Sequence, residues 1–455
     1  MISKSGTITL IGAGLVGPLL AIGLVKRGFD VEIYERRPDM RRVSVSAGRS
    51  INLALSARGI HALTEAGLWD EMRSITVLMK GRMIHSAAAD LTFQPYGKDD
   101  SEVIYAISRA DLNVALINAA ESRGVRIKFQ QRCTGFTLKT GELTLQNEQT
   151  DEHRVLQRDV VIGCDGSASA IRNEMRKLAG FHVSQQHLDY GYKELTIPAG
   201  PDGSHALDTH VLHIWPRGNH MLIALPNVDG TFGCILFLPF EGGDSFAQLG
   251  TGADVTAFFS SRFPDATAVM PEFAEQFFVN PTGSMVTVKC LPWHAEGRAL
   301  LLGDAAHAIV PFFGQGINCG FEDCTVLLQL IDRHGGDWDR IFAEFEEARK
   351  VNTDAIADLA LENFVEMRDR VSDPRFLFRK KVELALEAKY PRLFVPKYAM
   401  VTFHRVPYAT ALKRGQVQDQ MLTQLCDGID RMEDLDWSKA DRLIQSALIP
   451  LELTS

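Results

Sequence analysis

A glycine-rich stretch near the N-terminus has the spacing that binds a dinucleotide pyrophosphate. Gly12-Ala13-Gly14-Leu15-Val16-Gly17 fits the pattern G-x-G-x-x-G and follows an expected strand over residues 7–11. The first glycine permits a tight turn, the second lets a pyrophosphate approach the backbone, and the third allows close helix–strand packing. The expected helix runs to about Arg27, and its free N–H groups favour a phosphate. Glu35, which ends a second expected strand, is placed to accept a hydrogen bond from a ribose hydroxyl.

Two later motifs favour FAD over a nicotinamide dinucleotide as the tightly bound group. Leu302-Gly303-Asp304-Ala305-Ala306-His307 follows a short buried strand, and a Gly-Asp pair at this place in flavoprotein hydroxylases receives the ribityl chain. Cys164-Asp165-Gly166-Ser167 resembles a further fingerprint of those enzymes, near FAD and the nicotinamide route. The sequence has no second G-x-G-x-x-G, which favours transient docking of the reduced nicotinamide over a separate nicotinamide domain.

A further glycine-rich stretch is expected to open a helix beside the flavin. Gly314-Gln315-Gly316-Ile317-Asn318 would point the N–H groups of that helix at the flavin edge that becomes negative on reduction, and so stabilise the reduced form. His307 is interpreted as structural, because no second base or metal ligand stands at a telling spacing from it. The sequence therefore predicts no metal site.

The elements around these motifs predict an α/β protein whose Rossmann-like FAD-binding domain is interrupted by a mostly antiparallel β-sheet domain. Residues 110–123 are expected to form a helix, and residues 125–130 and 158–163 strands. Strand-like runs then appear at 211–215, 220–225 and 232–238, and a buried strand returns at 298–302. The expected units are the FAD-binding domain in two parts, residues 1–180 and 286–370, a substrate domain at 181–285, and a C-terminal helical lid at 371–455.

Composition bounds the possible partners and the compartment. The net charge of −9 and the absence of a cationic cluster argue against nucleic-acid binding. Seven cysteines without a C-x-x-C pair indicate reduced thiols of a cytosolic protein. No run of about 18 apolar residues occurs, so no membrane span is expected. The oligomeric state stays open.

Longer segments resemble the kynurenine 3-monooxygenase family of single-component FAD-dependent aromatic hydroxylases, and the resemblance covers nearly the whole chain. It implies noncovalent FAD, NADPH as reductant, O2 as oxidant, and hydroxylation of L-kynurenine at C3 through a flavin C4a-hydroperoxide. Eukaryotic members carry a hydrophobic C-terminal anchor, whereas this chain reaches Ser455 without one. Either a soluble, bacterial-type member or a shortened form of an anchored one is expected, and the cytoplasm is the expected compartment of this chain. The resembling segments are residues 48–56, 80–83, 94–97, 192–195, 212–216, 361–367 and 398–403.

The resemblance also implies roles for individual residues. Arg82 would pair with the substrate carboxylate, assisted by the hydroxyls of Tyr96 and Tyr398, and a guanidinium offers a planar fork for that purpose. Phe312 and Phe313 would wall the pocket, and Asn363 and Glu366 would hold polar groups of the ligand from one helix face. No side chain is expected to be an essential acid or base. The expected FAD-binding residues are Gly12, Gly14, Val16, Gly17, Glu35, Arg36, Ala54, Arg109, Cys133, Asp165, Gly303, Asp304, Gly316, Ile317 and Asn318.

Two other functions stay open at this point. A related FAD hydroxylase could act on another aromatic compound such as a hydroxybenzoate. A non-catalytic escort-type protein could also use the same scaffold, and that interpretation predicts no tightly bound flavin. Taken singly, each proposed pocket residue would more often be an ordinary ion-paired or packing residue, so the assignment depends on their occurring together.

Overall fold

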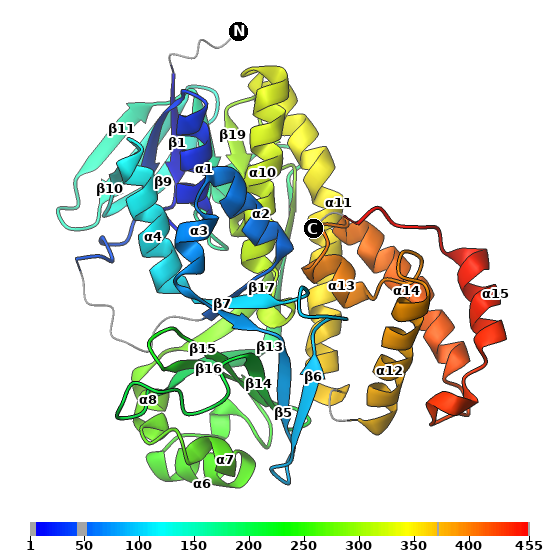
Figure 1. Ribbon diagram of the computed structural model, residues 1–455. Helices are drawn as coiled ribbons and strands as arrows, with labels where there is room; N and C mark the ends of the chain where they lie inside the picture. Colours follow the sequence, from blue (N-terminus) through cyan, green and yellow to red (C-terminus); the bar gives the residue numbers. More distant parts are fainter. Residues whose placement is uncertain (1–5, 43–51, 371–372, 454–455) are drawn as a thin grey trace.

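The computed structural model describes residues 6–42, 52–370 and 373–453. Residues 48–51 of one resembling segment, and Val371 at the start of the expected lid, lie outside the described residues. Among the described residues, four β-sheets are surrounded by helices, and the last helices of the chain form a lobe of their own (Figure 1).

The first sheet, called here the parallel sheet, has the order β18-β19-β12-β1-β2-β8 in the described residues. All its pairings are parallel except that of β18 with β19. Strands such as β12 are buried along their whole length, as sheets covered on both faces require. Its strands are β1 (Thr7–Ile11), β2 (Asp30–Tyr34), β8 (Arg126–Lys128), β12 (Val160–Gly163), β18 (His294–Ala295) and β19 (Ala299–Leu301).

The helices around this sheet bury an apolar core with it, and β19 completes the sheet only after the whole intervening domain, as the sequence predicted. Helices α1 and α10 lie side by side in Figure 1. The helices are α1 (Val16–Lys26), α2 (Ala57–Ala66), α3 (Trp69–Arg73), α4 (Arg109–Ser122), α5 (Ala170–Met175), α9 (Asp304–His307) and α10 (Gly316–His334).

Two small antiparallel sheets, which the sequence analysis did not predict, flank the parallel sheet. One consists of β9 (Gln131–Thr137), β10 (Glu142–Asn147) and β11 (His153–Gln157). The other consists of β3 (Asn52–Leu55), β4 (Thr76–Met79) and β7 (Ile104–Ser108).

The large sheet has the order β17-β13-β16-β15-β14-β5-β6 and is antiparallel except where β14 pairs with β5. Two of its strands, β5 and β6, come from the stretch expected for the first part of the FAD-binding domain, and β17 crosses the boundary expected at residue 285. The strands are β5 (Gly81–His85), β6 (Leu91–Pro95), β13 (His182–Ile197), β14 (Val211–Pro216), β15 (Met221–Pro226), β16 (Phe232–Pro239) and β17 (Thr282–Leu291).

The large sheet buries one face under a helical layer with its own apolar cluster. This layer consists of η1 (Phe246–Gln248), α6 (Gly252–Arg262), α7 (Pro264–Thr267) and α8 (Phe273–Val279). Strands β15 and β16 also contribute residues to a second cluster, shared with helix α11 and the C-terminal helices.

The C-terminal part is helical, as predicted, and begins with the long helix α11 (Trp338–Val365). A π-helical turn (Glu366–Arg370) follows α11, and the helices after it form the lobe drawn in orange and red in Figure 1. A separate apolar cluster including Leu386 and Leu422 holds this lobe together. Its elements are α12 (Pro374–Lys389), α13 (Lys397–Thr402), α14 (Tyr408–Leu425), η4 (Met432–Asp434) and α15 (Trp437–Ala447).

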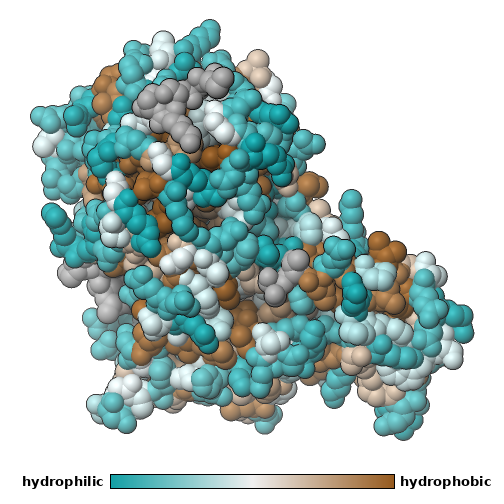
Figure 2. Space-filling model, turned by 45° about the horizontal axis from the view of Figure 1, so that its top comes forward, coloured by the Kyte–Doolittle hydropathy of each residue, from teal (hydrophilic) through white to brown (hydrophobic). Residues whose placement is uncertain are grey.

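The outer face seen in Figure 2 is largely hydrophilic, and its hydrophobic areas are small and interrupted. In the part of the chain that the structure describes, no helix combines the length and the apolar character needed to cross a membrane.

Candidate active site

One cavity of about 700 Å³ brings together most of the residues singled out in the sequence. It reaches from the phosphate turn of the parallel sheet to the inner face of the large sheet. The expected substrate residues in its lining are Arg82, Tyr96, Phe312, Phe313 and Tyr398. The expected cofactor residues in its lining are Gly12, Gly14, Val16, Glu35, Arg36, Ala54, Arg109, Cys133, Asp165, Asp304, Gly316 and Ile317.

The three glycines of the first motif serve different purposes. Gly12 has a φ of +107°, and a Cβ there would lie 2.4 Å from the Cys164 carbonyl oxygen. A Cβ on Gly17 would lie 2.1 Å from the Gly12 carbonyl oxygen, so this glycine is needed for packing. A Cβ on Gly14 would meet no described atom within 4 Å. Protein packing therefore does not explain Gly14, whereas a pyrophosphate lying against the backbone does.

Two helix N-termini at this cavity are free to bind negative charge. Helix α1 begins after Leu15 and α10 after Gln315, and within the described residues neither has a side-chain cap or an acid in its first turn. Helix α6, away from the cavity, is instead capped by a reciprocal Thr251–Asp254 capping box. Uncapped N–H groups favour anions, so the ends of α1 and α10 suit a pyrophosphate and the anionic edge of a reduced flavin.

Carboxylates line the same end of the cavity. Glu35 is buried and accepts hydrogen bonds from the backbone N–H groups of Ala13 and Arg37, at 2.8 and 2.9 Å. Burial raises the pKa of Glu35, but the hydrogen bonds and charge of Arg37 outweigh it, so the carboxylate stays ionised and can accept from a ribose. Asp165 Oδ2 accepts from the Ala170 N–H at 2.7 Å, while its buried Oδ1 has no partner among the described residues. Asp304 is exposed at the start of α9.

The other three expected cofactor residues shape the cavity without lining it. Gly17 packs as described above, and Gly303 has a φ of +62° close to the side chain of Val16. Asn318 Oδ1 accepts from the N–H groups of Ser56 and Gly59, at 2.9 and 3.2 Å. Asn318 Nδ2 donates to the carbonyls of Ala54 and Gly314, each at 2.8 Å. Asn318 thus fastens the turn after β3 to the N-terminus of α10.

The opposite end of the cavity carries Arg82, on β5. The guanidinium carbon lies 5.1 Å from the ring centroid of Tyr398 and 5.6 Å from that of Tyr96. Burial raises the pKa of both phenols, so each hydroxyl keeps its proton and can donate a hydrogen bond. Arg82 Nε and Tyr96 Oη are buried without a hydrogen-bond partner in the described chain. Buried donors that converge on one space suit an anionic group such as a carboxylate.

Aromatic side chains form one wall at this end. Phe313 stacks on Tyr398 with ring centroids 5.5 Å apart, and Phe312 stacks on Phe364 at 4.2 Å. The facing wall was missed by the sequence analysis and consists of residues from β15 and β16 with Ile104, Leu212 and Met367. The strand residues are Ile223, Leu225, Ile235 and Phe237. They stand at i and i+2 along their strands, so the period-2 pattern could have shown that they share one face.

Asn363 and Glu366 line a different cavity, of about 790 Å³, between α11 and the C-terminal lobe. Phe313 and Tyr398 belong to both linings and stand between the two spaces. Asn363 Nδ2 donates to the Phe312 carbonyl at 2.7 Å and so holds the aromatic wall. Burial lowers the pKa of Arg82, but its polar neighbours outweigh burial and raise it, the Glu366 carboxylate among them. The structure therefore brings Glu366 toward Arg82 but uses Asn363 to support the wall.

Comparison with known proteins agrees with this geometry. The family model of the FAD binding domain matches residues 6–336. A kynurenine 3-monooxygenase of Myxococcus xanthus is 55% identical over 449 residues, covering 98% of this chain and 97% of the relative. The chain belongs to the kynurenine 3-monooxygenase family. A relative of that name from Flavobacterium psychrophilum is 46% identical, with 98% of this chain and 99% of the relative covered.

Solved structures of other flavoproteins share the fold. A 2-methyl-3-hydroxypyridine-5-carboxylic acid oxygenase has a TM-score of 0.66 at 22% identity, covering 83% of this chain and 96% of the other. Pseudomonas aeruginosa PqsL, in complex with 2-aminobenzoylacetate, has a TM-score of 0.64 at 17% identity, covering 80% and 97%. Membership of the family confirms the expected FAD cofactor, and the chain is an FAD-dependent oxidoreductase.

Proposed function

We propose that this enzyme hydroxylates L-kynurenine at C3, with NADPH as reductant and O2 as the source of the oxygen atom. The observation that carries the proposal is the half-buried Arg82, whose guanidinium is flanked by two protonated phenols at the opposite end of the cavity from the phosphate turn. In this proposal Arg82 is the carboxylate anchor, and an aromatic-lined pocket separates it from the flavin end. Kynurenine has the matching groups, namely an α-carboxylate and an aniline ring.

Each wall of the pocket then has a task. Arg82, with Tyr96 and Tyr398, binds the carboxylate and fixes the direction in which the amino acid lies. Phe312 and Phe313, with the apolar residues of β15 and β16, line the space for the ring and keep water from it. When bound, FAD supplies the electron transfer and oxygen activation. The protein contributes orientation and a dry site, and no side chain is assigned as an essential acid or base.

The direct test is NADPH oxidation by the purified holoenzyme with and without L-kynurenine, with the product identified by mass. We expect stimulation by kynurenine and a product heavier by one oxygen atom. A hydroxybenzoate that is hydroxylated while kynurenine is not would favour the related-hydroxylase alternative. A folded protein that purifies without flavin would favour the escort-type alternative.

We also propose that the enzyme works in the cytoplasm. All seven cysteines are free thiols, and five of them are buried. Burial raises the pKa of buried thiols such as Cys133 and Cys234 to about 12. This usage is typical of a reducing compartment. Fractionation of the native host, followed by the kynurenine-dependent activity, tests the assignment.

A further inference from the structure

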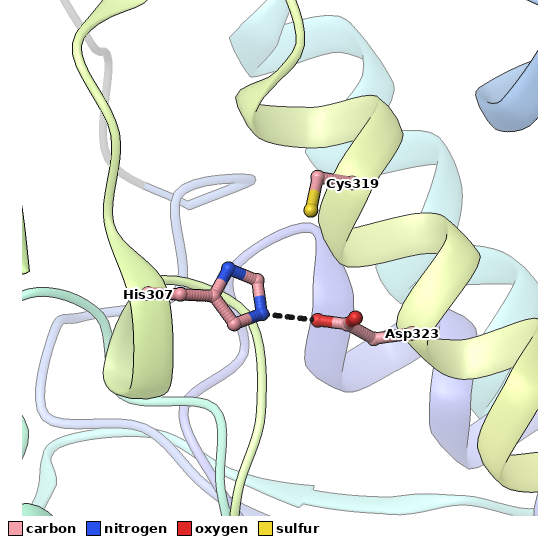
Figure 3. A group of neighbouring side chains, drawn as sticks. All are labelled: His307, Cys319 and Asp323. Carbon is pink, nitrogen blue, oxygen red and sulfur yellow. Dashed lines mark hydrogen bonds and ion pairs between the residues drawn. The ribbon is translucent and has the colours of Figure 1, made fainter. Parts of the chain in front are cut away.

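A buried chain of charged side chains runs from the Gly-Asp motif into the C-terminal half of the fold. Asp323 Oδ2 accepts from His307 Nε2 at 2.7 Å, the contact drawn in Figure 3. Asp323 Oδ1 accepts from Arg349 Nε at 2.6 Å, and Arg349 Nη1 donates to Glu322 Oε2 at 2.5 Å. Glu322 Oε1 accepts from Arg58 Nε at 2.9 Å. The chain therefore joins α9, α10, α11 and α2 through side chains alone.

The contacts within this chain are those of an ion-pair network. His307, Cys319 and Asp323 offer atoms within 4.8 Å of one another, and Figure 3 shows them at the junction of α9 and α10. Burial opposes protonation of His307, but the adjacent Asp323 raises its pKa to about 10, so the ring is an imidazolium. Both oxygens of the Asp323 carboxylate therefore accept charged hydrogen bonds, one from His307 and one from Arg349.

Arg58 is the end of the chain that reaches the C-terminal region. Its side chain is fully buried. Its Nη1 donates to the carbonyls of Val401 and His404, and its Nη2 donates to the carbonyl of Val406. These carbonyls belong to the end of α13 and to the segment between α13 and α14. Carbonyls at a helix end lack partners within the helix, so Arg58 supplies the donors that fix this junction.

A second connection links the same junction to the flavin end of the cavity. The Arg58 guanidinium lies 3.9 Å from the ring centroid of Tyr408, the first residue of α14. Tyr408 Oη donates to Gln315 Oε1 at 2.9 Å, and Gln315 Nε2 donates to Ser56 Oγ at 3.2 Å. Gln315 precedes the first residue of α10, whose N-terminus lines the cavity. The α13–α14 junction is thus connected to α10 twice, once through Arg58 and once through Tyr408 and Gln315.

Helix α13 carries Tyr398, one turn before Val401. Tyr398 contacts Tyr96 and Phe313 through its ring, and its hydroxyl faces Arg82 closely enough to affect the pKa of that arginine. A shift of the α13–α14 junction would therefore move the Tyr398 hydroxyl relative to the carboxylate anchor. Closely packed buried side chains have few alternative positions, so α13 moves as a unit and a displacement of the junction also displaces Tyr398.

We propose that Arg58 is a positioning residue that acts through Tyr398: it locks α13 to the flavin-facing end of α10 and so sets the distance between substrate anchor and cofactor. The inference rests on the proposed function only in that Tyr398 contacts a carboxylate substrate. It predicts energetic coupling between Tyr398, which lines the cavity, and Arg58, which does not.

A double-mutant cycle tests the coupling. The variants are Arg58→Met, Tyr398→Phe and the double variant, each loaded with FAD, and the readouts are flavin content, kynurenine KM and product formed per NADPH. Because contacting or linked residues have non-additive effects, we expect Arg58→Met to raise KM by up to about fivefold in the wild type, no more than loss of the Tyr398 hydroxyl does, but less than about twofold in the Tyr398→Phe background. Product per NADPH should fall in Arg58→Met, and flavin content should not, because Asn318 still fastens the α10 end.

The matched control is Arg217→Met. Arg217 also donates to several backbone carbonyls, those of Arg262, His85, Pro216 and Ser86, but it lies outside the cavity lining. It should leave KM and coupling unchanged. Arg58→Lys, which keeps a charge beside Glu322, should recover part of the lost product yield. Additive effects of Arg58→Met and Tyr398→Phe, or equal effects of Arg217→Met and Arg58→Met, would overturn the proposal.

A milder variant keeps the inference testable if Arg58→Met does not fold. Tyr408→Phe leaves Arg58 and its ring contact in place and removes only the hydrogen bond to Gln315. We expect a smaller rise in KM in the same direction, again suppressed in the Tyr398→Phe background, and full additivity would contradict the inference. If the wild type turns over another aromatic carboxylate instead of kynurenine, the proposed function fails, but the same cycle with that substrate still decides the role of Arg58.

Discussion

The two ends of the active-site cavity are built in different ways. At the expected flavin end, backbone groups dominate the lining: the Gly12–Gly17 turn, the free N-termini of α1 and α10, and the turn that begins α9, with carboxylates such as Glu35 beside them. All of these elements belong to the parallel sheet or pack on it. At the substrate end, the contacts come from side chains on β5, on the segment after β6, on the 3-10 turn η2 (Pro311–Phe313) and on α13.

This difference means that one end of the cavity is rigid, whereas the geometry of the other end can be changed. A site made of backbone N–H groups on a covered parallel sheet is rigid and recognises what FAD has in common with other dinucleotides. A site made of side chains from four distant segments can be altered by moving one of them, and α13 is one such segment, packed in the apolar cluster that it shares with the large sheet and α11. Flavin binding and substrate binding should therefore respond to different substitutions.

The largest expected effect is on the flavin end. Gly14→Val would place a branched side chain in the open space where the pyrophosphate is expected, since a Cβ there meets no described atom within 4 Å. We expect a folded protein that has lost its FAD and its colour, measured by absorbance of the purified chain. Gly250→Val is the control, because that exposed glycine also has open space around it. A Gly14→Val protein with a full complement of flavin would refute the assignment of the phosphate turn.

Arg82→Ala should impair substrate binding and leave FAD binding intact, the reverse of Gly14→Val. Truncating one partner of a buried charge pair costs ~2–5 kcal/mol, so the kynurenine KM should rise strongly while the FAD content stays the same. Steady-state kinetics with kynurenine and with an analogue lacking the carboxylate separates the two contributions. If the variant and the wild type differ as much for the analogue as for kynurenine, Arg82 does not bind the carboxylate.

The junction between the C-terminal lobe and the segment after Tyr96 should be sensitive to pH. Burial, followed by the charge of Glu102, raises the pKa of Glu387 on α12 from 4.5 to about 7, whereas Lys98 lowers it. The folded state therefore holds a proton that the unfolded state has lost between these two pH values, and the free energy of unfolding should fall by ~2 kcal/mol as the pH rises through this window. Urea unfolding at several pH values measures it.

Glu387→Gln should remove this pH dependence, while Glu347→Gln, on an exposed position of α11, should keep it. The flavin content should be constant across the same window in all three proteins. If the free energy of unfolding of Glu387→Gln depended on pH as steeply as that of the wild type, another group would be responsible. The pH dependence could then not be assigned to this junction.

Tyr398→Phe should have the smallest effect on binding but a distinct effect on coupling. Loss of one hydrogen bond to a bound ligand costs about 1 kcal/mol, so kynurenine should bind about fivefold more weakly. A carboxylate held less firmly leaves the ring less well placed, and more NADPH should be oxidised to hydrogen peroxide. NADPH loss, peroxide and hydroxylated product, measured in one vessel at saturating kynurenine, decide the matter: equal product per NADPH in both proteins would exclude Tyr398 from coupling.

The same contrast explains how much the sequence could predict. The flavin end is encoded in short contiguous motifs, and the strands and helices expected around Gly12, Asp165 and Asp304 are present with small differences in their bounds. Glycine spacing and hydrophobic periodicity are local properties, so the parallel sheet and its interruption followed from them. The fold class and the FAD cofactor were predicted correctly.

The rest depends on pairings that no local pattern contains. Strand β5 joins the large sheet through a parallel register with β14, in which Arg82 lies opposite Leu212. An amide such as Asn363 must find a hydrogen-bond partner, but its sequence does not indicate that the partner is the Phe312 carbonyl. Arg58 was not singled out, because an arginine on a short helix is usually solvated, and only the tertiary structure shows what surrounds it.

The parallel pairing of β5 with β14 also has a consequence during synthesis, because β5 is made long before the strand with which it pairs. The ribosome releases the β5–β6 hairpin before β14, its partner, has been made, and Leu91 and Phe93 on β6 are exposed even in the finished protein. A nascent chain that pauses before β14 therefore presents an unpaired sheet edge, which is prone to association with other chains. The antiparallel domain likewise cannot be cut out of the gene as one continuous segment, since the strand that carries Arg82 would be left behind.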